Sequence, residues 1–124
     1  MKLFVFAGLA MALSTSLSWA DGDATKGEQL AKQCAACHSF VDSSNKVGPS
    51  LVGIVGRKPG SAQGYNYSEP FKSYAAGFTA WDEAMLDAWL KDPRTVVKGT
   101  KMAFGGVKDD AVRADLIAYL KSKN

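Results

Sequence analysis

Two cysteines and a histidine stand together in the stretch QCAACHSF, at Cys34, Cys37 and His38. A Cys-x-x-Cys pair alone fits a thiol redox couple, half of a zinc site or a disulfide. The histidine directly after the pair narrows the choice, because Cys-x-x-Cys-His is typical of covalent haem attachment. On one helical turn both thiols face the same way. Each can then form a thioether with a haem vinyl group, and the imidazole can bind the iron.

The alternatives require residues that this chain lacks. A structural zinc site needs four Cys or His ligands, whereas the chain has two cysteines and one histidine. A thioredoxin-like pair follows a strand in a βαβ unit, and no segment alternates convincingly enough to be a strand. A plain disulfide stays open as an alternative, although it leaves the long loops and the small core unexplained.

A second iron ligand has few candidates. His38 is the only histidine, which excludes a bis-histidine site. Methionine is then the leading ligand, and methionine–histidine ligation raises the potential of a cytochrome. Met85 belongs to an apolar helix face, where packing is its expected role, whereas Met102 lies in the glycine-containing loop KGTKMAF. Gap filling by Met102 stays an alternative. So does an open or lysine-bound sixth position, which would suit a ligand-binding sensor or a peroxidase-like protein.

The first twenty residues have the three parts of a secretory signal. Lys2 supplies the positive start, an apolar run covers residues 3–13, and the small residues Ser18 and Ala20 precede the expected cleavage site. The run is shorter than the about 20 apolar residues of a membrane span. We therefore expect a removed signal at residues 1–20, export to the periplasm and one mature domain, residues 21–124, without stable membrane insertion.

The charge of the mature chain is mild. The full sequence has 15 basic and 12 acidic residues, and removing Lys2 leaves 14 against 12, a balance of +2. This balance is too small to indicate nucleic-acid binding, so any docking surface depends on local placement of lysines. A domain of this size buries a limited core, which a large apolar cofactor would stabilise.

Three stretches are expected to fold as helices. The first covers residues 25–36 behind a candidate cap at Asp23. Gly27 lowers the helix propensity there by about 1 kcal/mol relative to alanine. A glycine at this position either admits a close neighbouring helix or is a weak point.

The second and third helices have clearer apolar periodicity. A pattern like a capping box, Thr79 followed by Asp82, begins the second helix, and Pro93 ends it. The third helix covers residues 109–121. Two long segments without an expected helix join the three helices, at residues 39–78 and 94–108. Loops of this length are uncommon in a compact domain unless they are functional. The pattern predicts an all-α, loop-rich domain.

Four motifs occur in an order that resembles class I cytochrome c, in particular the soluble bacterial members that are similar to mitochondrial cytochrome c. They are CAACH at residues 34–38, VGPSL at 47–51, GYNYS at 64–68 and KGTKMAF at 98–104, followed by a terminal helix, RADLIAYLK. The resemblance covers nearly the whole mature chain. It implies about three main helices and long loops wrapped around one covalent haem c, in a one-electron carrier that is not an enzyme.

The resemblance also implies roles for single residues. Cys34 and Cys37 would carry the haem, His38 and Met102 would bind its iron, and the Pro49 carbonyl would accept the imidazole proton. Buried propionates need charges or hydrogen-bond donors. The matching positions here are Arg57, Tyr67 and Trp81, with Tyr65 and Thr100 as weaker candidates.

Three further positions are compared with the family pattern. Gly27 matches the glycine where the first and last helices cross, opposite Leu116 and Tyr119 or Leu120. Lys98 stands where a proline often precedes the glycine of the methionine loop, which predicts a less stiff loop. Trp89 stands where a tyrosine is common. An indole cannot accept a hydrogen bond, so we expect different surroundings for the Met102 sulfur and a changed potential.

The family's partners are also implied. Lysines around the exposed haem edge would meet acidic membrane or periplasmic redox complexes, such as an oxidase, a reductase or a reaction centre, in short encounters. The candidate lysines lie near the ligand motifs in sequence: Lys32, Lys46, Lys91, Lys98 and Lys101. Scattered solvated charges are the alternative reading of these lysines. A monomer is expected.

Overall fold

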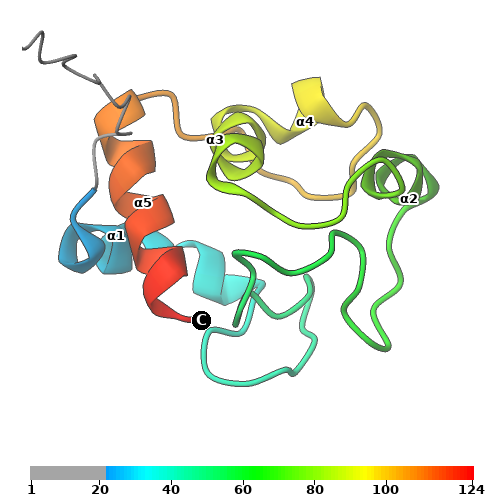
Figure 1. Ribbon diagram of the computed structural model, residues 1–124, viewed down its shortest axis with the longest axis horizontal. Helices are drawn as coiled ribbons and strands as arrows, with labels where there is room; N and C mark the ends of the chain where they lie inside the picture. Colours follow the sequence, from blue (N-terminus) through cyan, green and yellow to red (C-terminus); the bar gives the residue numbers. More distant parts are fainter. Residues whose placement is uncertain (1–21) are drawn as a thin grey trace, which may run out of the picture.

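The computed structural model describes residues 22–124 (Figure 1). The predicted secretory signal, residues 1–20, lies outside the described residues. Within residues 22–124 every regular element is helical and no strand occurs, so the all-α prediction is confirmed. No helix in this part of the chain has both the length and the apolar character needed to cross a membrane.

The first helix is shorter than predicted. α1 spans Ala24–Ala31, and a separate 3-10 turn, η1, spans Cys34–Ala36. The Asp23 carboxylate caps α1, as predicted, by accepting two first-turn backbone N–H groups at 2.9 and 3.2 Å. The prediction of one continuous helix over residues 25–36 is therefore wrong. The cysteines lie in the tighter turn, a form used in short pieces where a helix ends.

Two short helices lie in segments that were predicted as loops. α2 spans Glu69–Ala75 and begins at Ser68, whose hydroxyl accepts a first-turn N–H at 3.3 Å. α4 spans Pro93–Val96 and begins at Asp92, whose carboxylate accepts a first-turn N–H at 3.3 Å. Each has a proline in its first turn, where backbone N–H groups have no partner within the helix, so the absence of an N–H costs no hydrogen bond. Pro93 thus ends one helix and begins the next.

The two longer helices are close to their predicted positions. α3 spans Glu83–Lys91 and α5 spans Asp110–Ser122. Each follows an aspartate, Asp82 or Asp109, whose carboxylate accepts a first-turn N–H at 2.8 or 3.0 Å. The capping role expected for Thr79 is wrong, because Asp82 is itself the cap.

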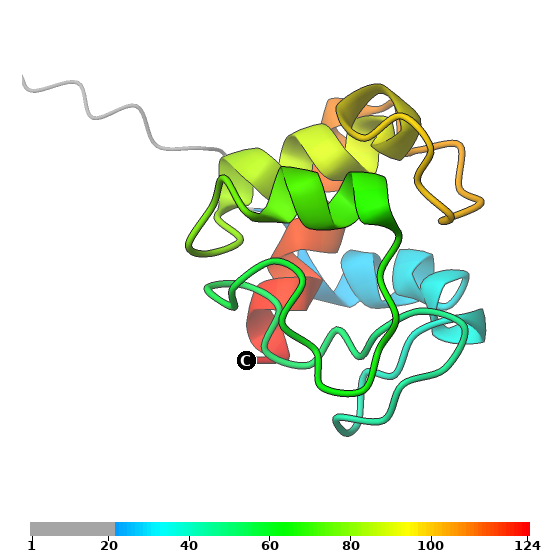
Figure 2. The ribbon, with the colours of Figure 1, turned by 90° about the vertical axis from the view of Figure 1, so that its right-hand side faces the viewer.

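α1 crosses α5 on one side of the molecule, and α2, α3 and α4 lie on the other side above a long loop (Figure 1, Figure 2). The crossing is close because Gly27 has no side chain. A Cβ there would lie 2.0 Å from the Asp115 carbonyl oxygen and 2.8 Å from Tyr119 Cβ. The Asp23 N–H also donates to the Asp115 carboxylate at 2.8 Å. Gly27 therefore admits the close neighbour that was expected, with Tyr119 opposite.

An aromatic cluster joins α2 to α3. Phe71 and Tyr74 of α2 lie 5.5 and 6.4 Å from the Trp89 ring, between centroids. Trp81, just before α3, lies 5.9 Å from Trp89 in an edge-to-face arrangement. Pairs of this kind contribute about 0.5–1.5 kcal/mol each beyond their buried area. α2 therefore packs into the core through its aromatic side chains.

Replacing Gly27 with alanine should destabilise the fold, although alanine favours the helix itself. The methyl group would overlap the Asp115 carbonyl oxygen, 2.0 Å away, and overpacking costs about 1–3 kcal/mol or more. We expect a lower guanidinium midpoint with an unchanged slope. Glu28→Ala, at the exposed neighbouring position, should stay within about 0.5 kcal/mol. An unchanged midpoint for Gly27→Ala would contradict a close crossing.

Candidate functional site

A cavity of about 390 Å³ lies where α3, α5 and the long loops meet. Its walls are largely apolar and include Leu51, Ile54, Phe71, Leu86, Leu90 and Leu120. All ten predicted site residues line it, although they are widely separated in sequence: Cys34, Cys37, His38, Pro49, Arg57, Tyr65, Tyr67, Trp81, Thr100 and Met102. Apolar walls with a few polar groups are typical of a site for a small organic ligand or cofactor.

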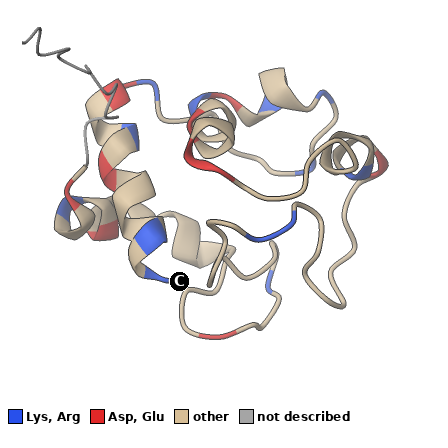
Figure 3. Ribbon diagram, in the orientation of Figure 1, with Lys and Arg blue, Asp and Glu red and all other residues tan. Residues whose placement is uncertain are grey.

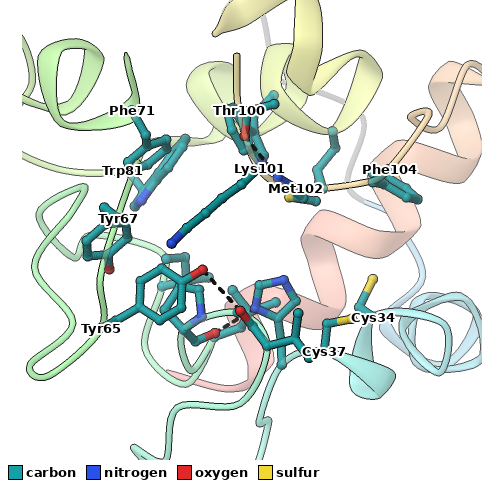
Figure 4. A pocket seen from close by; sticks show the side chains of 18 of the residues that line it. Cys34, Cys37, Tyr65, Tyr67, Phe71, Trp81, Thr100, Lys101, Met102 and Phe104 are labelled. Atoms are coloured by element: carbon teal, nitrogen blue, oxygen red, sulfur yellow. Dashed lines mark hydrogen bonds between the residues drawn. The ribbon is translucent and has the colours of Figure 1, made fainter. Parts of the chain in front are cut away.

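The turn that carries the cysteines is closed by its own backbone. The N–H groups of Cys37 and His38 both donate to the Cys34 carbonyl, at 3.0 and 2.9 Å. Both cysteines are half-buried, and Figure 4 shows them together on one side of the cavity. Burial, with the neighbouring Cys37, raises the pKa of the Cys34 thiol. The turn therefore presents two thiols to one cavity, and Cys34 is uncharged at neutral pH.

One hydrogen bond orients the His38 imidazole. Its Nδ1 lies 2.6 Å from the Pro49 carbonyl oxygen, and because a carbonyl only accepts, Nδ1 carries the proton. Nε2 then keeps its lone pair for a metal ion. Burial lowers the pKa of His38, and the charges of Lys46 and Arg57 act in the same direction, so the ring is neutral at neutral pH. Gly48 leaves room for the ring, since a Cβ there would lie 2.3 Å from Cε1.

Met102 faces the cavity from the side opposite the cysteines (Figure 4). Its loop turns at Gly99, whose φ of +81° is a conformation that glycine adopts without strain. The Met102 N–H donates to the Thr100 hydroxyl at 3.3 Å, and the Phe104 N–H donates to the Met102 carbonyl at 3.0 Å. Met102 is the only methionine among the described residues that line the cavity. Met85 packs against the core, as predicted.

Arg57 is a half-buried cation, and one of its three side-chain nitrogen atoms makes no hydrogen bond within the described residues. Its Nη1 and Nη2 groups donate to the carbonyl oxygens of Val52 and Ser50, at 3.1 and 2.7 Å. Its Nε is the one buried side-chain polar atom without a hydrogen-bond partner in the described part of the chain. Burial lowers the pKa of the guanidinium, and no ion pair within residues 22–124 includes it. An anionic group in the cavity would satisfy both needs.

Three aromatic donors line the cavity together with Arg57. The Tyr67 hydroxyl accepts a backbone N–H at 3.0 Å, and the Tyr65 hydroxyl donates to a backbone carbonyl at 3.1 Å. Their rings meet edge to face at 4.7 Å. Trp81 lies beside Arg57, because its backbone N–H donates to the Arg57 carbonyl at 2.8 Å. Donors from three loop positions therefore reach one cavity.

Sequence reasoning missed several residues of the site. Phe71 forms part of the wall because α2, which was not predicted, carries it there. The available signal was the cap residue Ser68, which is followed by an acidic residue and a proline in the first turn. Lys101 was considered only as a docking charge. In the structure it lines the cavity, its Nζ donates to the Asn66 carbonyl, and it lies 5.0 Å from the centre of the Tyr65 ring (Figure 4). No local pattern indicates this contact, because it depends on two loops meeting.

The residues present fit haem better than a bare metal ion. Within residues 22–124 no three His, Cys, Asp or Glu side chains form a group that could hold a metal ion, which argues against zinc. Haem combines an apolar ring, anionic propionates and an iron that accepts imidazole. The cavity supplies apolar walls, an unpaired Arg57 donor and the His38 Nε2. Fold and site define a small helical protein built for covalent haem attachment.

Comparison with known proteins agrees with this class. The family model described as cytochrome c matches residues 24–124. Cytochrome c2 of Rhodomicrobium vannielii is 45% identical over 126 residues, covering 100% of this chain and 98% of that protein. Cytochrome c of Gibberella zeae is 46% identical, covering 82% and 95%. The structure of cytochrome cH from Methylobacterium extorquens matches with a TM-score of 0.74 and 47% identity, covering 82% of this chain and 100% of that one.

The chain belongs to the cytochrome c family. It is an electron carrier of the cytochrome c2 type and not an enzyme, and Cys34 and Cys37 are its pair for covalent haem c. The predicted family, fold class, function and cofactor are thereby confirmed. Carriers of this kind meet redox partners transiently, which agrees with the general form of the partner prediction.

Proposed function

We propose that this chain carries single electrons in the periplasm through a haem c whose iron is bound by His38 and Met102. The observation that carries the proposal is the placement of the attachment turn and the Met102 side chain on opposite sides of one cavity (Figure 4). Haem c, when bound, supplies a ferric–ferrous couple. With His38 and Met102 as iron ligands, the chain would leave no iron position for a substrate, so the chemistry of the site would be electron transfer.

The surroundings of the iron favour a high potential. Methionine ligation and apolar walls both act in this direction, because low polarity disfavours the extra positive charge of the ferric form. Trp89 is 9% exposed and lines the cavity. Its indole has only a donor, so it gives the Met102 sulfur different surroundings from those that a tyrosine would provide.

The propionates are assigned to the polar residues that line the cavity. Arg57 is the first candidate, because its buried Nε has no partner in the described chain. Tyr67 and Trp81 line the cavity beside it. Tyr65 stays a weaker candidate, since its O–H already donates to a backbone carbonyl. The hydroxyls of Tyr67 and Thr100 each accept a backbone N–H and keep a proton to donate. This is the arrangement expected where anionic groups lie below a protein surface.

Docking is assigned to lysines at the rim of the cavity rather than to total charge. Figure 3 shows Lys and Arg positions spread over several helices and loops of residues 22–124. Lys46 is exposed and donates to the Ala35 carbonyl of η1 at 2.6 Å, which holds its charge beside the attachment turn. Next to it, Val47 is 75% exposed and lines the cavity. A cation next to an exposed apolar side chain suits brief contact with an acidic redox protein.

Replacing Met102 with alanine tests the ligand assignment. We expect the wild-type protein to have a low-spin, six-coordinate spectrum in both oxidation states. Met102→Ala should become high-spin and bind carbon monoxide when reduced, because its sixth position has lost the thioether. Met85→Leu, at the core methionine, should keep the low-spin spectrum. A wild type that is already high-spin and binds small ligands would favour a sensor or peroxidase-like protein with a labile sixth ligand.

The docking assignment predicts a charge-dependent rate. Lys46→Glu should slow reduction of the ferric protein by flavin mononucleotide semiquinone, an anion, by about twofold or more at low salt. Reduction by uncharged lumiflavin semiquinone should be unaffected. Lys26→Glu, on α1, makes the same change of charge away from the attachment turn and should have the smaller effect. Equal effects of the two variants would mean that only net charge matters.

Export is tested by the mature N-terminus. Residues 1–20 are proposed to be removed, leaving 124 − 20 = 104 residues that begin at Asp21. Mass spectrometry of protein from the periplasmic fraction should give the mass of residues 21–124 plus one haem. Ala20→Arg should accumulate as the uncut precursor, because the cleavage site requires small residues. A wild-type mass that retains residues 1–20 would contradict removal of the signal.

A further inference from the structure

We propose that Arg113 is a positioning residue for Met102, because it holds the end of the loop that delivers this side chain to the cavity. The proposal rests on the ligation by Met102 proposed above. Arg113, Asp87, Asp110 and the carbonyl groups of Val107 and Lys108 are here named the Arg113 cluster. The cluster does not touch the cavity, and no residue of it was identified from the sequence as part of the site.

The Arg113 side chain is only 4% exposed, and each of its three nitrogen atoms donates to a partner within the protein. Nε donates to Asp87 of α3 at 2.7 Å, and Nη2 donates to Asp110 at 2.6 Å. Nη1 donates to the carbonyl oxygens of Val107 and Lys108, at 3.0 and 3.3 Å. Planar guanidinium groups suit such divided contacts, which a lysine cannot reproduce. Arg113 therefore joins α3, α5 and the end of the Met102 loop in one contact set.

The same end of the loop is also held against the last turn of α3. The Val107 N–H donates to the Leu90 carbonyl at 2.7 Å, and the Lys108 ammonium group donates to the Lys91 carbonyl at 2.8 Å. Gly106 has φ of +100°, and a Cβ there would lie 2.0 Å from the Lys91 carbonyl oxygen. Leu90 itself lines the cavity. These contacts and the Arg113 cluster together hold the chain where it leaves the cavity after Met102.

The rest of the loop has few such contacts. Among the described residues, the backbone hydrogen bonds of residues 98–105 are local, and the Lys101 bond to the Asn66 carbonyl is the one that reaches a distant segment. Segments with few buried contacts open at low free energy, without global unfolding. Opening of this loop would remove Met102 from the iron. The Arg113 cluster is the buried, charged attachment that opposes it.

A purely structural role would give a different result, and the chain offers a matched control. Glu83 and Lys121 also join α3 to α5, through an ion pair of 2.6 Å. Neither residue of that pair lines the cavity. Asp87 in contrast reaches the loop through Arg113, whose other partners are Asp110 and two loop carbonyl groups. A variant that weakens the Asp87–Arg113 ion pair and one that weakens the Glu83–Lys121 ion pair should therefore separate loop opening from loss of helix packing.

The experiment measures cyanide binding to the ferric, haem-loaded protein, which requires Met102 to leave the iron. Asp87→Asn keeps the side-chain shape and removes the less exposed of the two carboxylates that balance Arg113, so we expect cyanide to bind about tenfold faster. Arg113→Lys should have a similar effect, because the loop carbonyl groups lose their donors. Glu83→Gln should stay within about twofold of the wild type. Ile117→Val, buried on α5 outside the cavity lining, controls for general loss of stability.

Two experimental results would overturn the proposal. One is a cyanide rate for Asp87→Asn that equals those of Glu83→Gln and Ile117→Val at comparable guanidinium midpoints, since Arg113 would then only join the helices. The other is a wild type that binds cyanide as fast as Met102→Ala and lacks the weak ferric sulfur–iron absorption band, because the ligation itself would have failed. The band separates the two failures. Its persistence in Asp87→Asn with a faster cyanide rate supports a positioning role.

Discussion

The backbone contact between α1 and α5 joins the two sides of the haem site. α1 leads directly into the turn that carries the cysteines, whereas α5 carries Arg113, which holds the end of the Met102 loop. The contact exists because no side chain separates Gly27 from the Asp115 carbonyl. From this helix pair only Leu120 lines the cavity. The geometry of the site therefore depends on a crossing that lies almost entirely outside it.

The two arginines with buried atoms represent two solutions to one electrostatic problem. Arg113 is surrounded by carboxylate and carbonyl oxygens, and every donor is used within the protein. The hydrogen bonds that its guanidinium donates to Asp87 raise the pKa of Arg113. Arg57 has only carbonyl partners, and its Nε is left over beside the cavity. An unbalanced buried cation is costly. Arg113 is balanced within the protein, whereas Arg57 is suited to receive an anionic cofactor.

The parts predicted from sequence were those decided within a few residues. The aspartate cap of the first helix, the end of α3 before Pro93 and the apolar face of α5 follow from local capping and periodicity. α2 was missed because seven residues are too few to show a helical repeat of apolar residues. Its serine cap also resembled the other polar residues of the loop. Arg113 was passed over since its partners come from α3 and from a loop, and a lone arginine on a helix is usually solvated.

The sequence by itself determined the attachment chemistry, because two thiols and an imidazole within five residues share one turn whatever surrounds them. It also limited the second ligand to a methionine, a lysine or an open position, because the chain has one histidine. Only the tertiary structure decided that Pro49 orients the imidazole, that ten distant residues share one cavity and that Arg57 keeps a free donor. Each of these depends on contacts between separate loops, and the energy of such contacts is set by burial and distance, which no local spacing specifies.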